Sequence, residues 1–195
     1  SSNTMTLSQV QLMKLQTMLG SPYIADIKDE CRKWERKLQF TQNLLDEWLA
    51  CQRTWMYLEP IFSSEDIMRQ MPVEGKRFAS VDALWRKTME ETKEEPAVMA
   101  DRSKLLDAFR EANKRLDMIQ KGLNDYLEVK RLAFPRFYFL SNDELLEILS
   151  QTKDPRAVQP HLGKCFEGIA KVSFRGEASG FGDVVIITTM VCSVG

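Results

Sequence analysis

The feature that most limits how this chain can fold is a run of apolar and neutral residues spaced alternately three and four apart. It starts after the turn sequence Gly20-Ser21-Pro22, and this spacing places its members on one face of a helix. The members are Ile24, Ile27, Cys31, Trp34, Leu38, Thr41, Leu45, Trp48, Gln52 and Trp55. We predict one long helix over about residues 22–58. Because tryptophan is too bulky for the seam of a two-stranded coiled coil, this helix should pack against several neighbours.

A second seam of the same kind predicts a long helix over about residues 97–133. Its members are Leu105, Phe109, Ala112, Leu116, Ile119, Leu123 and Tyr126. Gly122 inside it marks either a weak point or a close contact between helices. Shorter helices are predicted before Gly20, after Ser64 and over 78–93. A further helix should begin at Ser141, where Glu144 three residues later completes a capping-box sequence.

Prolines and a change of period divide the rest of the chain. Pro60 is expected to stop the first long helix and Pro135 the second, since the residue before proline is pushed out of the helical region. The short aromatic run at 136–140 predicts a buried strand or an extended crossing. In residues 171–195 apolar and polar side chains first alternate, a glycine-rich stretch follows, and β-branched residues come last. This order predicts a β-hairpin.

These patterns together predict a mainly α fold. We expect the whole sequence, 1–195, to form a single elongated multi-helix bundle. We expect sub-bundles at about 1–96 and 97–170, followed by the hairpin at 171–195. The sequence stops directly after the last predicted strand. We therefore expect it to be a piece of a longer protein.

The charge balance excludes several classes of partner. There are 27 Lys and Arg against 28 Asp and Glu, so the formal net charge of −1 gives no reason to expect nucleic acid or an anionic membrane. No apolar stretch approaches the roughly 20 residues that span a bilayer. The 4 cysteines form no C-x-x-C pair, and the first ten residues lack the pattern of an export signal, so we expect an intracellular chain with reduced thiols.

The sequence offers little that could perform chemistry. The single histidine, His161, lies four residues before Cys165 on a predicted helix over 161–170. The two side chains could supply only half of a metal site, or a catalytic dyad of a cysteine nucleophile and a histidine base. A partly exposed structural histidine is the favoured interpretation. No glycine-rich loop is followed by Lys and Ser or Thr, as phosphate binding requires. We expect no catalytic, cofactor-binding or metal-binding residues.

One charge stands out because aromatic residues flank it. Arg136 lies between Pro135 and Phe137, and it should either pair with a carboxylate or stack on a ring. Structural anchoring is the favoured role and partner binding the alternative.

Three segments carry a resemblance to a known family. They are Trp55 to Ile67 (WMYLEPIFSSEDI), Leu123 to Arg131 (LNDYLEVKR) and Phe134 to Leu149 (FPRFYFLSNDELLEIL). They resemble the linker region of dynein heavy chains, and the likeness extends from about Trp48 to Phe174. The sequence around Ser141 and the segment Lys153-Asp154-Pro155 are more similar to axonemal heavy chains of the inner arm than to cytoplasmic heavy chains.

The resemblance implies a mechanical role. In this family the linker is a helical rod that bends over a ring of ATPase modules during the nucleotide cycle. ATP and magnesium sites and the microtubule-binding stalk would lie C-terminal to this region, and the parent chain would bind microtubules and other dynein subunits in the axoneme of a cilium or flagellum. The fragment itself would contact its own ring and be monomeric in isolation. Candidate hinge or structural residues are Pro60, Phe62, Phe134, Pro135, Arg136, Phe137, Tyr138 and Phe139.

Two other classes of function stay open at this stage. A free-standing helical scaffold would bind a protein partner through an amphipathic groove. A stand-alone enzyme has the least support, because no arrangement of catalytic residues is recognisable.

Overall fold

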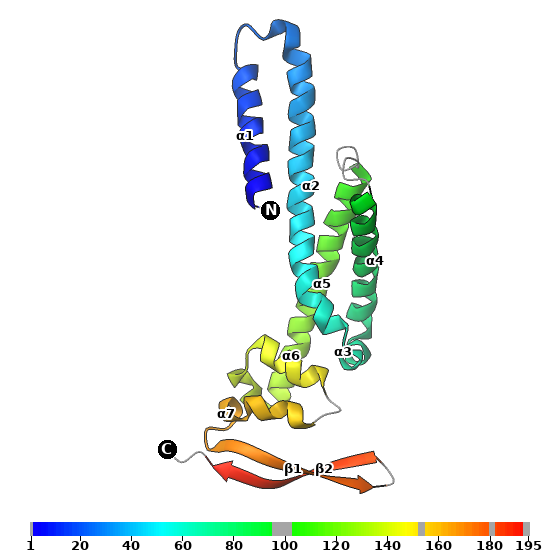
Figure 1. Cartoon of the computed structure of the whole chain (residues 1–195), viewed down its shortest axis with the longest axis vertical. Helices are drawn as coiled ribbons and strands as arrows, with labels where there is room; N and C mark the ends of the chain where they lie inside the picture. The colour runs from blue at the N-terminus through cyan, green and yellow to red at the C-terminus, as the bar shows by residue number, and fades with distance from the viewer. Residues whose placement is uncertain (1, 95–102, 152–154, 180–181, 193–195) are drawn as a thin grey trace. The chain divides into compact units, whose positions relative to one another are not determined.

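The computed structural model describes residues 2–94, 103–151, 155–179 and 182–192, and most of them are helical (Figure 1). The first part contains α1 (Ser2–Leu19), η1 (Ala25–Ile27), α2 (Lys28–Phe62), α3 (Glu65–Gln70), α4 (Pro72–Glu94) and α5 (Ser103–Ala133). The second part contains η3 (Pro135–Phe139), α6 (Asn142–Ser150), η4 (Pro155–His161), α7 (Leu162–Cys165), β1 (Ile169–Ser179) and β2 (Gly182–Cys192). The predicted fold class, mainly α with two long helices and a C-terminal hairpin, is confirmed. Residues 97–102 of the second predicted helix and 193–195 of the hairpin lie outside the described residues.

The chain forms two compact units. Unit 1 comprises 1–58 and 77–118, and unit 2 comprises 59–76 and 119–195. Each unit combines two separate stretches of sequence, whereas the predicted sub-bundles 1–96 and 97–170 are continuous. The reason is that α2, α4 and α5 each contribute residues to both units.

Unit 1 is organised around four aromatic side chains from three helices. Trp48 and Trp55 come from α2, Trp85 from α4 and Phe109 from α5. The rings of Trp55 and Trp85 are stacked, with their centroids 5.4 Å apart. The ring centroids of Trp48 and Phe109 are 5.2 Å apart. Trp85 also meets Trp48 at 6.2 Å and Phe109 at 6.4 Å, both edge-on. Trp48 and Trp55 of the first seam therefore pack against α4 and α5 as expected, whereas Trp34 of the same seam is exposed.

Polar groups at the edge of this aromatic cluster fix the helices further. The Trp55 indole N–H donates to Asp82 Oδ1 at 2.9 Å, and Arg86 donates to both oxygens of the same carboxylate. The Asn113 amide donates to the Glu47 backbone carbonyl at 3.0 Å and to its side chain at 2.6 Å. These bonds join α2 to α4 and α2 to α5, so they fix the register of all three helices within the unit.

Unit 2 has an aliphatic core built from shorter elements. Its buried residues include Phe62, Ile67, Met71, Leu123, Leu127, Leu140, Leu145, Leu146, Leu149 and Leu162. Gly122 of α5 faces Glu74 of α4, and a Cβ at this glycine would lie 2.9 Å from Glu74 Oε1. Of the two predicted roles for Gly122, the close contact is therefore the one observed.

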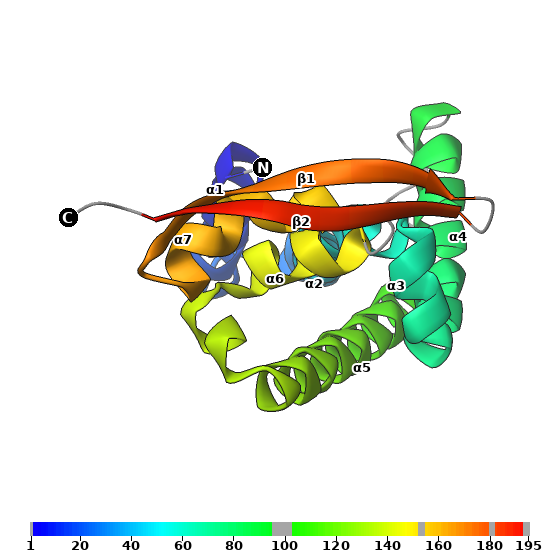
Figure 2. The same cartoon turned by 90° about the horizontal axis from the view of Figure 1, so that it is seen from below.

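The hairpin is the only sheet among the described residues. β1 and β2 pair antiparallel, from Ile169 with Cys192 to Ser179 with Gly182, with register irregularities after Ile169 and Ser173. Figure 2 shows the two strands side by side. Val172 is buried, and its backbone N–H donates to the Gln159 side chain at 3.4 Å. The start of the hairpin is thereby joined to η4.

Several local predictions need correction. Pro60 does not stop the first long helix, because α2 continues through it to Phe62. Proline removes only the bond that residue 60 would donate to Met56, and Ser63 N–H then donates to the Glu59 carbonyl at 2.9 Å. The helix also begins at Lys28, after the η1 turn, and the helix expected over 161–170 is only the short α7.

The crossing expected at 136–140 is neither extended nor buried. Residues 135–139 form the 3₁₀ helix η3, with Pro135 at its start, where the fixed φ of proline suits a helical first position. Phe134 before it is extended, as the residue preceding proline should be. Phe139 is 68% exposed and Tyr138 51% exposed, and only Leu140 is buried.

Candidate functional site

The segment from the end of α5 to the end of α7 contains most of the residues selected from the sequence. All of it belongs to unit 2. We call the residues 128–166 that connect α5, η3, α6 and α7 the junction. α5 ends where Phe134 N–H donates to the Lys130 carbonyl, and η3 is closed by Leu140 N–H donating to the Phe137 carbonyl at 3.1 Å.

Arg136 is held at the junction by a carbonyl and a ring. Its Nη1 donates to the Cys165 backbone carbonyl at 2.9 Å, and its guanidinium carbon lies 4.7 Å from the centre of the Phe166 ring. Of the two predicted contacts, stacking on an aromatic ring is therefore observed. A planar guanidinium can lie flat on a ring while its N–H groups donate in their own plane, an arrangement that a lysine ammonium does not reproduce. Arg136 joins η3 to the C-terminal end of α7.

The phenylalanines around Arg136 pack on one another. Side chains three residues apart eclipse in a 3₁₀ turn, and the Phe134 and Phe137 ring centroids lie 4.8 Å apart, edge to face. Phe134 also lies 6.3 Å from Phe166. The Phe134 ring thus contacts the other two, although none of the three rings is fully buried.

Two further contacts fix η3 on α5. Tyr138 hydroxyl donates to Glu128 Oε1, and this bond to a carboxylate is the main cause that raises the pKa of Tyr138. Arg131 Nη2 donates to the Leu140 carbonyl at 3.2 Å and to Asn142 Oδ1 at 2.8 Å. The last turns of α5 thus hold the C-terminal end of η3.

The capping box predicted at the start of α6 is confirmed. Ser141 Oγ accepts from Glu144 N–H at 3.3 Å, and Ser141 N–H donates to Glu144 Oε2 at 2.9 Å. The other oxygen of Glu144 accepts from Lys164 of α7. The Lys164 hydrogen bond and then the Ser141 backbone lower the pKa of Glu144 to about 2. One carboxylate therefore caps α6 and joins it to α7.

His161 is buried rather than partly exposed, with 5% of its surface accessible. Its Nε2 lies 3.4 Å from Glu147 Oε2 and its Nδ1 lies 3.9 Å from Glu144 Oε1. Cys165 is also buried, and burial is the main cause that raises the pKa of its thiol, so a reactive thiolate is not favoured there. His161 of η4 and Cys165 of α7 thus contribute to packing, and the His161 imidazole faces the carboxylates of Glu144 and Glu147 on α6.

Pro60 and Phe62 lie outside the junction, at the end of α2. Pro60 is exposed and Phe62 is buried. After them, Ser64 precedes α3 and its hydroxyl donates to the Ser150 carbonyl at the end of α6, at 3.1 Å. The candidate residues of the sequence thus fall into two groups, Pro60 with Phe62 and 134–139. Sequence reasoning missed Glu128, Arg131 and Lys164. In the sequence they look like ordinary charged residues of a helix surface, and only the fold brings them to their partners.

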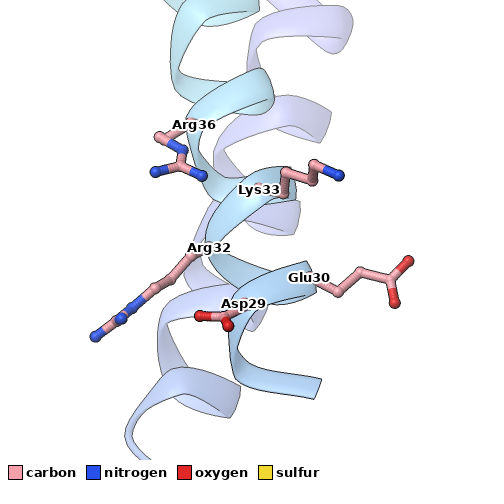
Figure 3. A pocket seen from close by; sticks show the side chains of 5 residues that line it. All are labelled: Asp29, Glu30, Arg32, Lys33 and Arg36. Carbon is pink, nitrogen blue, oxygen red and sulfur yellow. The ribbon is translucent and has the colours of Figure 1, made fainter. Parts of the chain in front are cut away.

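No arrangement in the described ranges suggests chemistry. Within them, no group of three or more His, Cys, Asp or Glu side chains could hold a metal ion, and no helix is long and apolar enough to cross a membrane. A hollow on α2 is lined by Asp29, Glu30, Arg32, Lys33 and Arg36. Figure 3 shows that these side chains project outward from the helix in different directions instead of converging on a ligand.

The fold and the junction define a mainly α segment whose identifiable polar groups hold helices together. The whole chain, residues 1–195, matches the family described as dynein heavy chain, N-terminal region 2. The chain belongs to the dynein heavy chain family.

Curated relatives agree with this assignment. The chain is 61% identical over 165 residues to dynein axonemal heavy chain 3 of Homo sapiens, covering 84% of this chain and 4% of that protein. It is 58% identical over 167 residues to dynein axonemal heavy chain 1 of Rattus norvegicus, covering 84% and 4%. It is 57% identical over 166 residues to dynein axonemal heavy chain 12 of Homo sapiens, covering 84% and 5%. The chain therefore spans about one twentieth of the length of these relatives.

Proposed function

We propose that this chain is a non-catalytic, force-transmitting linker segment of an axonemal dynein motor. In this proposal it bends over the motor's own ATPase ring during the nucleotide cycle and so drives microtubule-based movement of a cilium or flagellum. ATP and magnesium would be bound elsewhere in the parent chain, which would also bind microtubules and other dynein subunits. The observation that carries the proposal is the match of all 195 residues to the dynein heavy chain N-terminal region, together with 56–61% identity to axonemal heavy chains.

The packing of each unit supports a mechanical role. A segment that transmits force must resist compression, and interdigitated aromatic side chains from three helices provide such resistance in unit 1. In unit 2 the junction joins α5, η3, α6 and α7 through Arg136, Arg131 and Glu144. Loss of one of these bonds should let the elements yield under load.

The proposal is tested in an intact axonemal heavy chain that carries Arg136→Ala. We expect slower microtubule gliding at an ATPase rate that is largely kept, because the ATP sites lie outside this segment in the proposal. Lys121→Ala is the matched control, since Lys121 is an exposed cation on α5 within the same unit. Gliding at the unchanged rate with Arg136→Ala, in a chain confirmed to be folded, would contradict a force-transmitting junction.

A further inference from the structure

The first half of α2 carries four cations within six residues, and they remain available for a partner. Arg32, Lys33, Arg36 and Lys37 are all exposed. In the described part of the chain none of them makes an ion pair, although Asp29 and Glu30 lie one turn away. We call these four residues the basic strip. Elsewhere on the helices, by contrast, Arg86, Lys87, Arg110 and Arg115 all pair with a carboxylate.

The charges of this surface follow a repeated order. Asp29, Arg32 and Arg36 form one row with spacings of three and four, and Glu30, Lys33 and Lys37 form a second row with the same spacings. Residues at these spacings lie along one face of a helix. Figure 3 shows Asp29, Arg32 and Arg36 on one side of α2 and Glu30 and Lys33 on the other. Each row thus presents one anion followed by two cations, about two turns long.

An aromatic side chain borders the second row. Trp34 is 53% exposed, and Lys37 Nζ lies 5.3 Å from the centre of its ring. Ile27, in the η1 turn just before α2, is also exposed, at 49%. Tryptophan and arginine are the residues most enriched at the energetic centres of protein interfaces. The surface therefore combines an apolar anchor with oriented charges.

We propose that the basic strip, with Trp34, binds an acidic amphipathic helix of a protein partner. Carboxylates spaced four apart on such a helix would meet Arg32 and Arg36, or Lys33 and Lys37, and an apolar side chain would cover Trp34. The anion at the start of each row repels further negative charge, so the pattern selects a partner with matching order and direction instead of a uniform polyanion. The net charge of −1 over the whole chain also gives no long-range attraction for nucleic acid or an anionic bilayer.

The test measures binding to the 195-residue chain by fluorescence anisotropy of a labelled helix-forming peptide. The peptide carries Glu at positions four apart beside a row of leucines, and a scrambled peptide has the same composition without that spacing. We expect the patterned peptide to bind at least ten times more tightly than the scrambled one. A 20-base DNA duplex and vesicles containing phosphatidylserine serve as uniform polyanions, and tighter binding of either would overturn the proposal.

Matched variants locate the surface. Lys33→Glu with Lys37→Glu should weaken binding of the patterned peptide at least tenfold, because two attractions become repulsions. Lys114→Glu with Lys121→Glu changes the net charge equally at exposed positions of α5 and should leave the affinity within about twofold. Lysine and glutamate have similar helix propensity, so both variants should keep their helices, which circular dichroism checks. Equal losses in the two variants would show that only overall charge matters and would refute the proposed site.

Discussion

Units 1 and 2 are stabilised by different means. Unit 1 relies on large rings from three long helices, in which Trp48, Trp55, Trp85 and Phe109 contact one another. Unit 2 uses smaller aliphatic side chains and has specific polar contacts at the ends of short elements, as at Ser141 and Arg136. The difference indicates that long helices are held by area buried along a seam, whereas short elements depend on the groups that fix their ends.

Removing a central ring should have the largest effect. Phe109 is fully buried between Trp48 and Trp85, and Phe109→Ala should lower the free energy of unfolding by about 3–5 kcal/mol through lost burial and the cavity left behind. Denaturant titration followed by circular dichroism measures this. Trp34→Ala removes a larger side chain from an exposed position and should change stability by less than about 0.5 kcal/mol. Similar losses in both variants would argue against an aromatic core.

Arg136→Ala should have a smaller effect on stability. The variant loses the bond to the Cys165 carbonyl and the contact with Phe166, and because Arg136 is exposed we expect a loss of about 1–2 kcal/mol. Arg136→Lys keeps the charge but not the planar group, so it should recover only part of this loss. Full recovery by lysine in denaturant titrations would show that charge alone is responsible.

Ser141→Ala should cost about 1 kcal/mol, the usual contribution of a helix N-cap. The variant leaves the Glu144 N–H without its acceptor and removes half of the capping box. Hydrogen exchange of the α6 amides should accelerate more than that of α5. Ser141→Asp replaces the hydroxyl by another good capping group, and exchange as fast as in the alanine variant would contradict the role assigned to the cap.

The smallest expected effect is on the dependence of stability on pH in the acid range. The pKa of Glu144 is lowered from 4.5 to about 2, first by Lys164 and then by Ser141. A carboxyl group whose pKa is lower in the folded than in the unfolded state stabilises the fold at pH values above the unfolded-state pKa. For Glu144 this contribution is lost as the pH falls from about 4.5 towards 2. Glu144→Gln should therefore flatten the fall of the melting temperature over this range. An identical slope in the variant and the parent protein would show that Glu144 does not carry the effect.

The sequence predicts the helical part of the fold well because its signals are local. The seams through Trp48 and Phe109 and the Ser141 cap each follow from spacing alone, and all three are observed. The prediction for residues 136–140 was wrong because aromatic content indicates burial, whereas Pro135 starts a 3₁₀ turn whose rings pack edge to face near the surface. The junction partners of Arg136 could not be predicted, since Cys165 and Phe166 lie about thirty residues away and meet it only through the fold.

The arrangement of the indoles also gives the protein two separate optical signals. Trp55 and Trp85 are stacked at 5.4 Å, close enough for their electronic transitions to couple, so their circular dichroism should report the integrity of unit 1. Trp34 stands apart from that cluster and is 53% exposed, so its emission should lie to the red and respond to a soluble quencher. Shielding of that one fluorophore from iodide, with an unchanged exciton signal, would register a ligand arriving on α2 without any added label.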